Sequence, residues 1–252
     1  MKISVCSDII FNRKPTAEAM KDIKAAGADA LEFWSADGKD LAAIAAASRD
    51  LDLPVAAFCA PVDDPPISPR GPESLPEKLR LAGEACEALG CRTLIVASGR
   101  PENGWAPAEM HDRLIASLEA CLPVAEEMDF TLLLEPINAS ERSYLRSSRE
   151  GFDICRMLNS PRLMLLYDLY HMQYGEGNLI NTIRANASMI GHVHAADLPG
   201  RRAPGSGEIN FPRVLEALSD AGCDCHVGLE YRPGEDAAGE LAATVALLKG
   251  GN

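Results

Sequence analysis

The sequence predicts a single (β/α)8 barrel, an α/β fold in which eight parallel strands are each followed by a helix. Short β-prone runs alternate with Ala-, Leu- and Glu-rich helical stretches from end to end. Strand runs such as "TLLL" (131–134) and "LMLL" (163–166) are apolar at every or nearly every position, which is typical of parallel sheets covered on both faces. Eight such units in 252 residues match the length of this barrel, so we expect one domain over residues 1–252.

The eight units follow one another in chain order, each a strand run with a helical run behind it. The first four pair "KISVCS" (2–7) with a helix near 15–26, "ADALEFW" (28–34) with 39–50, "PVAAFCA" (54–60) with 75–90, and "RTLIVAS" (92–98) with 107–128. The last four pair "FTLLLEP" (130–136) with 148–159, "LMLLYD" (163–168) with 177–188, "IGHVHAAD" (190–197) with 211–221, and "HVGLEY" (226–231) with 236–249.

The loops also favour a barrel over its rival, a doubly wound open sheet. The sequence has no G-x-G-x-x-G or G-x-x-x-x-G-K-[ST] phosphate loop to support a nucleotide-binding version of that sheet. The longer Pro- and Gly-rich loops follow the third, fourth and seventh strands, so they would gather on one rim. In a barrel this C-terminal rim carries the active site, and we expect the site there.

Charge and hydropathy narrow the classes of partner. The net charge of −13, without a basic run, opposes binding to nucleic acid or to an anionic membrane. No stretch reaches the roughly 18 apolar residues of a membrane span, and the start "MKISVCSDII" is too short for a signal peptide. Eight scattered cysteines without an export signal indicate reduced thiols. We therefore expect a cytoplasmic protein with a small-molecule, metal or protein partner.

Metal-competent side chains end four consecutive predicted strands: Glu135, Asp168, His194 and Glu230. In a barrel they would rise at the same edge. Three carboxylates and one imidazole form an oxygen-dominated set suited to Mn²⁺, Mg²⁺ or Co²⁺. Taken singly, each carboxylate could instead cap a turn or pair with a surface arginine. Four such residues at matching ends of adjacent strands favour a shared site.

Strand seven carries two imidazoles that face the same way. His192 and His194 are two residues apart and so point to one side of the strand. We expect His194 nearer the barrel mouth as a ligand, and His192 one layer deeper as a core imidazole satisfied by hydrogen bonds.

Five motifs together resemble the xylose isomerase-like TIM-barrel superfamily, and within it the hydroxypyruvate isomerase branch: "LLLEPIN", "YDLYHMQ", "GHVHAAD", "PGSGEIN" and "GLEY". The resemblance covers essentially the whole chain. It implies one divalent cation, Mn²⁺ or Mg²⁺ with Co²⁺ as a further candidate, on the four strand-end residues. It also implies that His171, in the loop after strand six, and Arg201 contact substrate oxygens, and that the protein forms a homodimer or homotetramer. Without this resemblance, we would take Arg201 for a solvated charge in a loop.

The implied activity is isomerisation of a small α-hydroxycarbonyl compound, of the hydroxypyruvate/tartronate semialdehyde type. A proton would move through a cis-enediolate, with Glu135 and Glu230 as acid and base. The alternative is a ketose 3-epimerase, or an isomerase of a 2-oxo-tetronate or sugar. His194 keeps it open, because some hydroxypyruvate isomerases carry Gln at this position and ketose 3-epimerases carry His.

Two other classes fit the sequence less well. An endonuclease IV-like metal-dependent hydrolase needs many more histidines than the five present, together with basic loops for DNA. A non-catalytic barrel predicts that at least one ligand is lost, and all four are retained.

Overall fold

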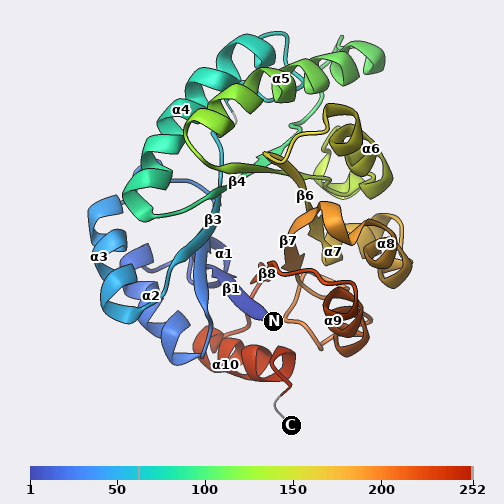
Figure 1. Ribbon diagram of the computed structural model, residues 1–252. Coiled ribbons are helices and arrows are strands. Elements are labelled where there is room, and N and C mark those ends of the chain that lie inside the picture. The colour runs from blue at the N-terminus through green and yellow to red at the C-terminus, as the bar shows by residue number, and fades with distance from the viewer. Residues whose placement is uncertain (62, 251–252) are drawn as a thin grey trace.

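Eight parallel strands close into a barrel in the computed structural model, which describes residues 1–61 and 63–250. Each strand pairs with the next along the chain, and β8 returns to pair with β1. The helices form a ring around the strands (Figure 1). The predicted (β/α)8 barrel is therefore confirmed. The predicted domain range of 1–252 includes residues 62, 251 and 252, which lie outside the described part of the chain.

The strands are short and nearly all buried. They are β1 (Lys2–Cys6), β2 (Ala30–Phe33), β3 (Val55–Cys59), β4 (Thr93–Ala97), β5 (Thr131–Glu135), β6 (Leu163–Asp168), β7 (Ile190–Ala195) and β8 (His226–Leu229). The main helices of the ring are α2 (Thr16–Ala25), α3 (Leu41–Leu51), α4 (Gly71–Leu89), α5 (Pro107–Glu127), α6 (Ser148–Leu158), α8 (Leu179–Asn186), α9 (Phe211–Asp220) and α10 (Ala237–Leu248).

Short helices add detail that the repeating pattern did not predict. Helix α1 (Ser7–Ile10) follows β1 directly, and α7 (Leu169–Gly175) follows β6 directly. Single 3-10 turns, η1 (Ala139–Glu141) and η2 (Ala187–Met189), complete the list. The prediction that His171 lies in a loop is therefore wrong, because it lies in the first turn of α7. Asp168 caps this helix, its Oδ1 accepting the His171 backbone N–H at 3.0 Å.

The barrel interior has an apolar half and a polar half. A small buried cluster fills the side of strands β3 to β6: Ala57, Ile95, Leu133 and Leu166. The side of β2 and β7 instead buries Glu32, His192 and His194. The outer strand faces pack against the helices in one large hydrophobic core. Polar groups are thus buried where hydrogen bonds can satisfy them, beside a rigid apolar support.

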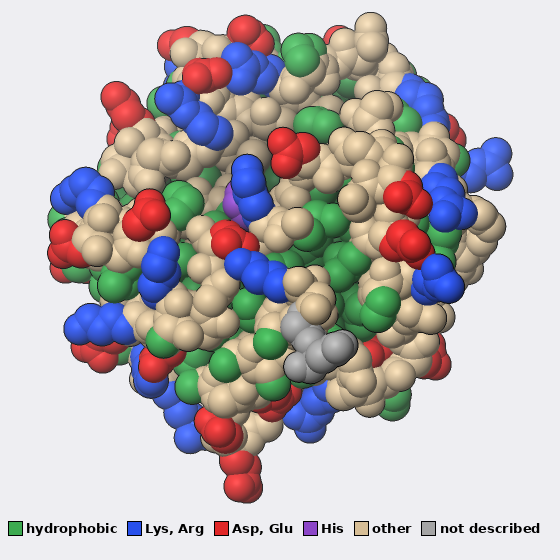
Figure 2. Space-filling view, turned by 60° about the horizontal axis from the view of Figure 1, so that its bottom comes forward, with side chains coloured by type: hydrophobic (Ala, Val, Ile, Leu, Met, Phe, Trp, Pro, Cys, Tyr) green, Lys and Arg blue, Asp and Glu red, His purple; other side chains and the backbone are tan. Residues whose placement is uncertain are grey.

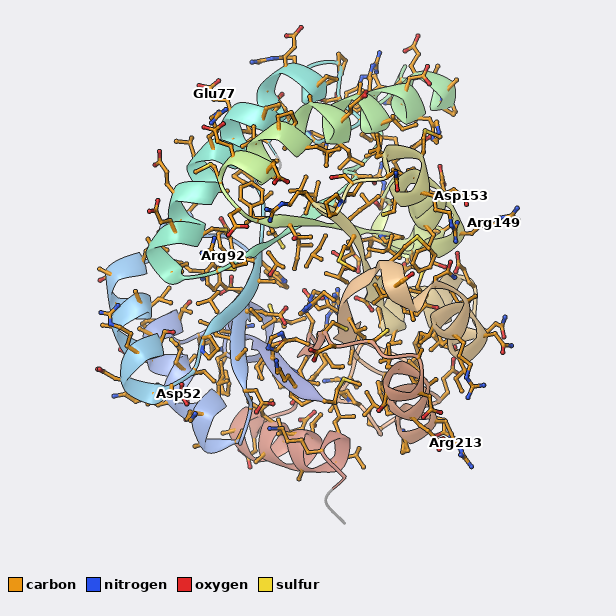
Figure 3. The ribbon with its side chains drawn as sticks, viewed as in Figure 1. Asp52, Glu77, Arg92, Arg149, Asp153 and Arg213 are labelled. Atoms are coloured by element: carbon orange, nitrogen blue, oxygen red, sulfur yellow. The ribbon has the colours of Figure 1, made fainter. Side chains whose placement is uncertain are left out.

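The outer surface is charged and mixed in sign. Glu77 on α4, Arg149 and Asp153 on α6, and Arg213 on α9 project outward from the helix ring (Figure 3). Acidic and basic side chains are interspersed over the face that Figure 2 shows. Within residues 1–61 and 63–250, no helix combines the length and apolar character needed to span a membrane.

Candidate active site

The four predicted ligands meet at the C-terminal mouth of the barrel. Glu135 and Asp168 end β5 and β6, His194 is the penultimate residue of β7, and Glu230 follows β8 by one residue. All four are buried, and one donor atom from each lies within 4.8 Å of the others. The barrel register explains this meeting, because Asp168 pairs with His194 across the β6–β7 ladder.

The two-residue period of a strand aims these side chains inward. Glu135 stands two residues after Leu133, and Asp168 two residues after Leu166; both leucines belong to the apolar cluster inside the barrel. The Glu230 backbone N–H donates to the Ala195 carbonyl at 3.2 Å, which continues the sheet for one residue beyond β8. Each carboxylate therefore stands on a strand that cannot easily shift.

His194 presents a free nitrogen to the three carboxylates. Its Nε2 bonds to Oε2 of Glu32 at 2.9 Å, while its Nδ1 lies 3.4 Å from Glu230 Oε2 and 3.8 Å from Glu135 Oε1. Within the described residues this buried Nδ1 has no hydrogen-bond partner. Burial opposes a charged imidazole, but the carboxylates, Glu230 foremost, outweigh it and hold the pKa of His194 well above its ordinary value.

Glu32 on β2 is a residue of this site that the sequence analysis missed. It is 1% exposed, and its two oxygens bond separately to Nε2 of His192 and Nε2 of His194, each at 2.9 Å. Burial raises the pKa of Glu32, but the two imidazoles outweigh that effect and leave it well below the ordinary value. The sequence did contain a sign of this residue, because the carboxylate stands inside the apolar run "ALEF". A strand covered on both faces has no place for an unpaired charge, so a glutamate there indicates a buried partner. The expectation that His192 is a hydrogen-bonded core imidazole is confirmed.

Gly228 on β8 makes room for this contact. A Cβ at position 228 would lie 2.4 Å from Oε1 of Glu32 and 2.8 Å from Cδ2 of His194. Only glycine therefore lets the carboxylate and the imidazole approach the strand this closely.

Arg201 reaches the cluster from the loop after β7. Its guanidinium forms an ion pair with Glu230, lies 3.9 Å from Asp168 Oδ2 and packs over the Tyr170 ring at 5.4 Å. Its side chain is 13% exposed, so the reading of a solvated loop charge is wrong. The neighbouring carboxylates outweigh burial and raise the pKa of Arg201, so the guanidinium stays charged.

Asp197 organises the loop that carries Arg201. It is fully buried, and its carboxylate accepts four backbone N–H groups at 2.8–3.0 Å, those of Leu198, Gly205, Gly207 and Ile209. One side chain thus folds a Gly- and Pro-rich segment into a fixed shape.

His171 donates toward the same cluster. The Asn138 side-chain oxygen accepts from the Ser140 backbone N–H and hydroxyl, so its amide NH₂ faces His171 and donates to Nδ1 at 2.8 Å. A neutral imidazole that accepts at Nδ1 carries its proton on Nε2. Nε2 lies 3.5 Å from Asp168 Oδ2, so this N–H points at the ligand cluster.

Glu230 is the most tightly held carboxylate of the four. Oε1 accepts the indole N–H of Trp34 at 2.5 Å, and Arg201 pairs with Oε2. Burial raises its pKa, but Arg201 and His194 outweigh that effect and bring the pKa to about 2. The arginine that pairs with Glu230 among the described residues is the largely buried Arg201, not a surface arginine such as the neighbouring Arg232. Glu230 is a fixed, buried carboxylate.

This donor set fits a hard divalent cation. Three carboxylates converge on one point with a nitrogen that has no hydrogen-bond partner in the part of the chain that the structure describes. Ligands that share a cation at about 2.1–2.4 Å lie no more than about 4.8 Å apart, which agrees with the observed spacing. Such a cation would balance the negative charge, and Glu32 would fix the ring of its histidine ligand from behind, as outer carboxylates do in metal sites.

Comparisons with known proteins show which family the chain resembles. The family model "Xylose isomerase-like TIM barrel" matches residues 20–248. A provisionally named hydroxypyruvate isomerase of Streptomyces coelicolor is 30% identical over 93% of this chain and 92% of its own length. The hydroxypyruvate isomerase of Escherichia coli K12 is 32% identical over 58% of this chain and 57% of its own length.

Two solved structures show the same fold. A Brucella melitensis protein described as an AP endonuclease of family 2 superposes with a TM-score of 0.90, 25% identity, and coverage of 97% of this chain and 98% of that one. An L-ribulose 3-epimerase superposes with a TM-score of 0.84 and 23% identity over 99% of this chain and 94% of that one, a likeness that bears on the fold alone.

The fold and the curated relatives define a barrel enzyme of the isomerase class. The chain belongs to the xylose isomerase-like TIM-barrel family, and its curated relatives include hydroxypyruvate isomerases.

Proposed function

We propose that the chain is a divalent-metal-dependent isomerase of a small α-hydroxycarbonyl compound, interconverting a substrate of the hydroxypyruvate type with its aldehyde isomer. The observation that carries the proposal is the set of four buried donors, in which three carboxylates surround a nitrogen without a hydrogen-bond partner among residues 1–61 and 63–250. Glu135, Asp168, His194 and Glu230 would hold the cation, Mn²⁺ or Mg²⁺ before Co²⁺. When bound, it would polarise the carbonyl group of the substrate as a Lewis acid.

The residues of the chain would position the substrate and move its proton. The Nε2–H of His171 and the guanidinium of Arg201 both point at the ligand cluster and would donate to the two substrate oxygens, stabilising negative charge as the C–H proton leaves. Glu135 and Glu230 would accept and return this proton, since a carboxylate oxygen that contacts one partner keeps a second lone pair. Arg201 would leave Glu230 to meet the substrate, which frees this carboxylate to act as a base.

Epimerisation of a ketose is the second candidate, and His194 near the end of β7 keeps it open, because ketose 3-epimerases carry His at this position. The two reactions differ in where the proton returns: to the neighbouring carbon in isomerisation, or to the opposite face of the same carbon in epimerisation. Hydrolysis of DNA is less well supported, because the four-residue cluster contains a single histidine and the net charge is −13.

The test is proton exchange in D₂O. The Mn²⁺-loaded protein is incubated with hydroxypyruvate and, separately, with four- to six-carbon ketoses, and NMR follows deuterium uptake and products. We expect deuterium at the reacting carbon of hydroxypyruvate and formation of tartronate semialdehyde. Exchange confined to C3 of a longer ketose would favour the epimerase, and no exchange with any substrate would refute both. Assembly into a homodimer or homotetramer and a cytoplasmic location stay predictions.

A further inference from the structure

Trp34 stands between the candidate base Glu230 and a groove on the outside of the site. It directly follows β2, and one edge of its indole donates to Glu230. The same residue lines a cavity of about 650 Å³ at the surface. Its exposure of 44%, next to a buried carboxylate, agrees with a position that borders both.

The groove has the size and chemistry to accept part of a polyhydroxylated molecule. Its volume falls within the roughly 300–1,000 Å³ of small-molecule pockets. Hydrogen-bonding side chains line it: Asp8, Asn12, Lys14, Thr16, Lys39 and Asp40. These groups can donate to and accept from hydroxyls.

The backbone of Trp34 is tied to a network of polar side chains. Its backbone N–H donates to Asp8 Oδ2 at 2.9 Å, and the other oxygen of Asp8 pairs with Lys39 at 2.6 Å. The Lys39 ammonium also donates to Thr16 Oγ1 at 3.0 Å. This connected set joins α1, α2 and the β2–α3 loop and anchors the Trp34 backbone, while the bond to Glu230 fixes the indole itself.

We propose that Trp34 determines substrate length. The inference rests on the proposed function, in which the reacting carbons lie beside Glu230. A three-carbon substrate ends before the indole, whereas a longer carbon chain that extends on this side meets the ring edge. The indole withholds the groove from such substrates, and a small residue at position 34 would join the groove to the site.

Two variants separate the bulk of the indole from its hydrogen bond. Trp34→Phe keeps most of the bulk and loses the N–H donor to Glu230, while Trp34→Ala loses both. Both should turn over hydroxypyruvate more slowly. The informative quantity is the ratio of kcat/KM for a five- or six-carbon ketose to kcat/KM for hydroxypyruvate. We expect Trp34→Ala to raise it about 10- to 100-fold, and Trp34→Phe to leave it within about threefold of wild type.

A third variant tests whether the groove itself receives the longer substrate. Ala43, in the first turn of α3, lines the groove and is not one of the candidate ligands, and Ala43→Trp would fill the groove. Added to Trp34→Ala, this substitution should cancel the gain on long ketoses. A five-carbon polyol should also inhibit Trp34→Ala more strongly than wild type. Circular dichroism establishes that each variant is folded, and Trp34→Leu replaces Trp34→Ala if the latter is not.

The outcomes separate the two proposals. Wild-type protein that exchanges protons with no α-hydroxycarbonyl compound overturns the isomerase and with it the role of Trp34. Wild-type protein that is active on hydroxypyruvate, with no rise in the ratio for Trp34→Ala or Trp34→Leu, overturns the role of Trp34 alone. A gain that survives Ala43→Trp likewise overturns it.

Discussion

Replacing Glu32 by Gln tests whether this carboxylate prepares His194 to bind a metal. The change keeps the shape of the side chain and removes its charge. In the wild-type protein, two Nε2–H groups each find a carboxylate oxygen at 2.9 Å. An amide offers one oxygen and one NH₂ group, so either His192 or His194 must face a second donor instead of an acceptor.

The expected magnitude follows from that lost acceptor. Removing an outer-shell partner of a metal ligand typically costs about 10- to 100-fold in metal affinity, which is about 1.4–2.8 kcal/mol. A buried donor without an acceptor should lower the free energy of unfolding by about 1–3 kcal/mol as well. Both effects arise from the same contact, because Glu32 is 1% exposed and no solvent can replace the lost oxygen.

Isothermal titration with Mn²⁺ measures the affinity, and urea unfolding measures the stability. The matched control is Glu77→Gln, on the outer face of α4, which should change neither (Figure 3). If Glu32→Gln lowers the free energy of unfolding but keeps an affinity for Mn²⁺ within about twofold of wild type, then Glu32 stabilises the core alone. That result would refute its role in preparing His194 to bind a metal. Unchanged stability and affinity together would show that the two hydrogen bonds carry little energy.

Three further predictions follow from particular contacts. Asp197→Asn should lower the free energy of unfolding by about 1–3 kcal/mol, read from urea denaturation, because an amide cannot accept all four backbone N–H groups; an unchanged midpoint would contradict this. Gly228→Ala should weaken Mn²⁺ binding in titrations, since its Cβ would strike Glu32, whereas Gly175→Ala, with open space around it, should not; equal affinities would disprove the steric argument. Asp29 has a lowered pKa because, although burial raises it, bonds from a backbone N–H and a lysine outweigh burial. It therefore stabilises the fold above its unfolded pKa, near 3.8, and that contribution is lost as the pH falls through the folded value. When the pH is lowered from 6 to 3, the free energy of unfolding of Asp29→Asn should therefore fall less than that of wild type. An equal fall in the two proteins would contradict the role of Asp29.

The barrel and four of its site residues could be predicted because both depend on local patterns. Runs of apolar residues alternating with helical stretches set the order of the elements, and parallel pairing then brings every strand end to one rim. A carboxylate or imidazole at a strand end must therefore lie near its neighbours. Glu135, Asp168, His194 and Glu230 were found from this rule, and the structure brings their donor atoms together.

Contacts across the barrel could not be predicted in this way. Glu32 precedes His194 by 162 residues, and only closure of the sheet brings them to 2.9 Å. Trp34 and Glu230 are 196 residues apart. The short helix that carries His171 escaped notice because the strand before it ends directly at the capping Asp168.

Hydrophobic period and motif spacing are properties of consecutive residues, and they were enough to predict the fold class, the family and the rim that carries the candidate ligand residues. The contacts between these groups became visible in the folded barrel: the orientation of the His194 ring by Glu32, the ion pair of Arg201 with Glu230, and the position of Trp34 beside the groove. These depend on side-chain direction and on distances between strands remote in sequence, which no local pattern encodes.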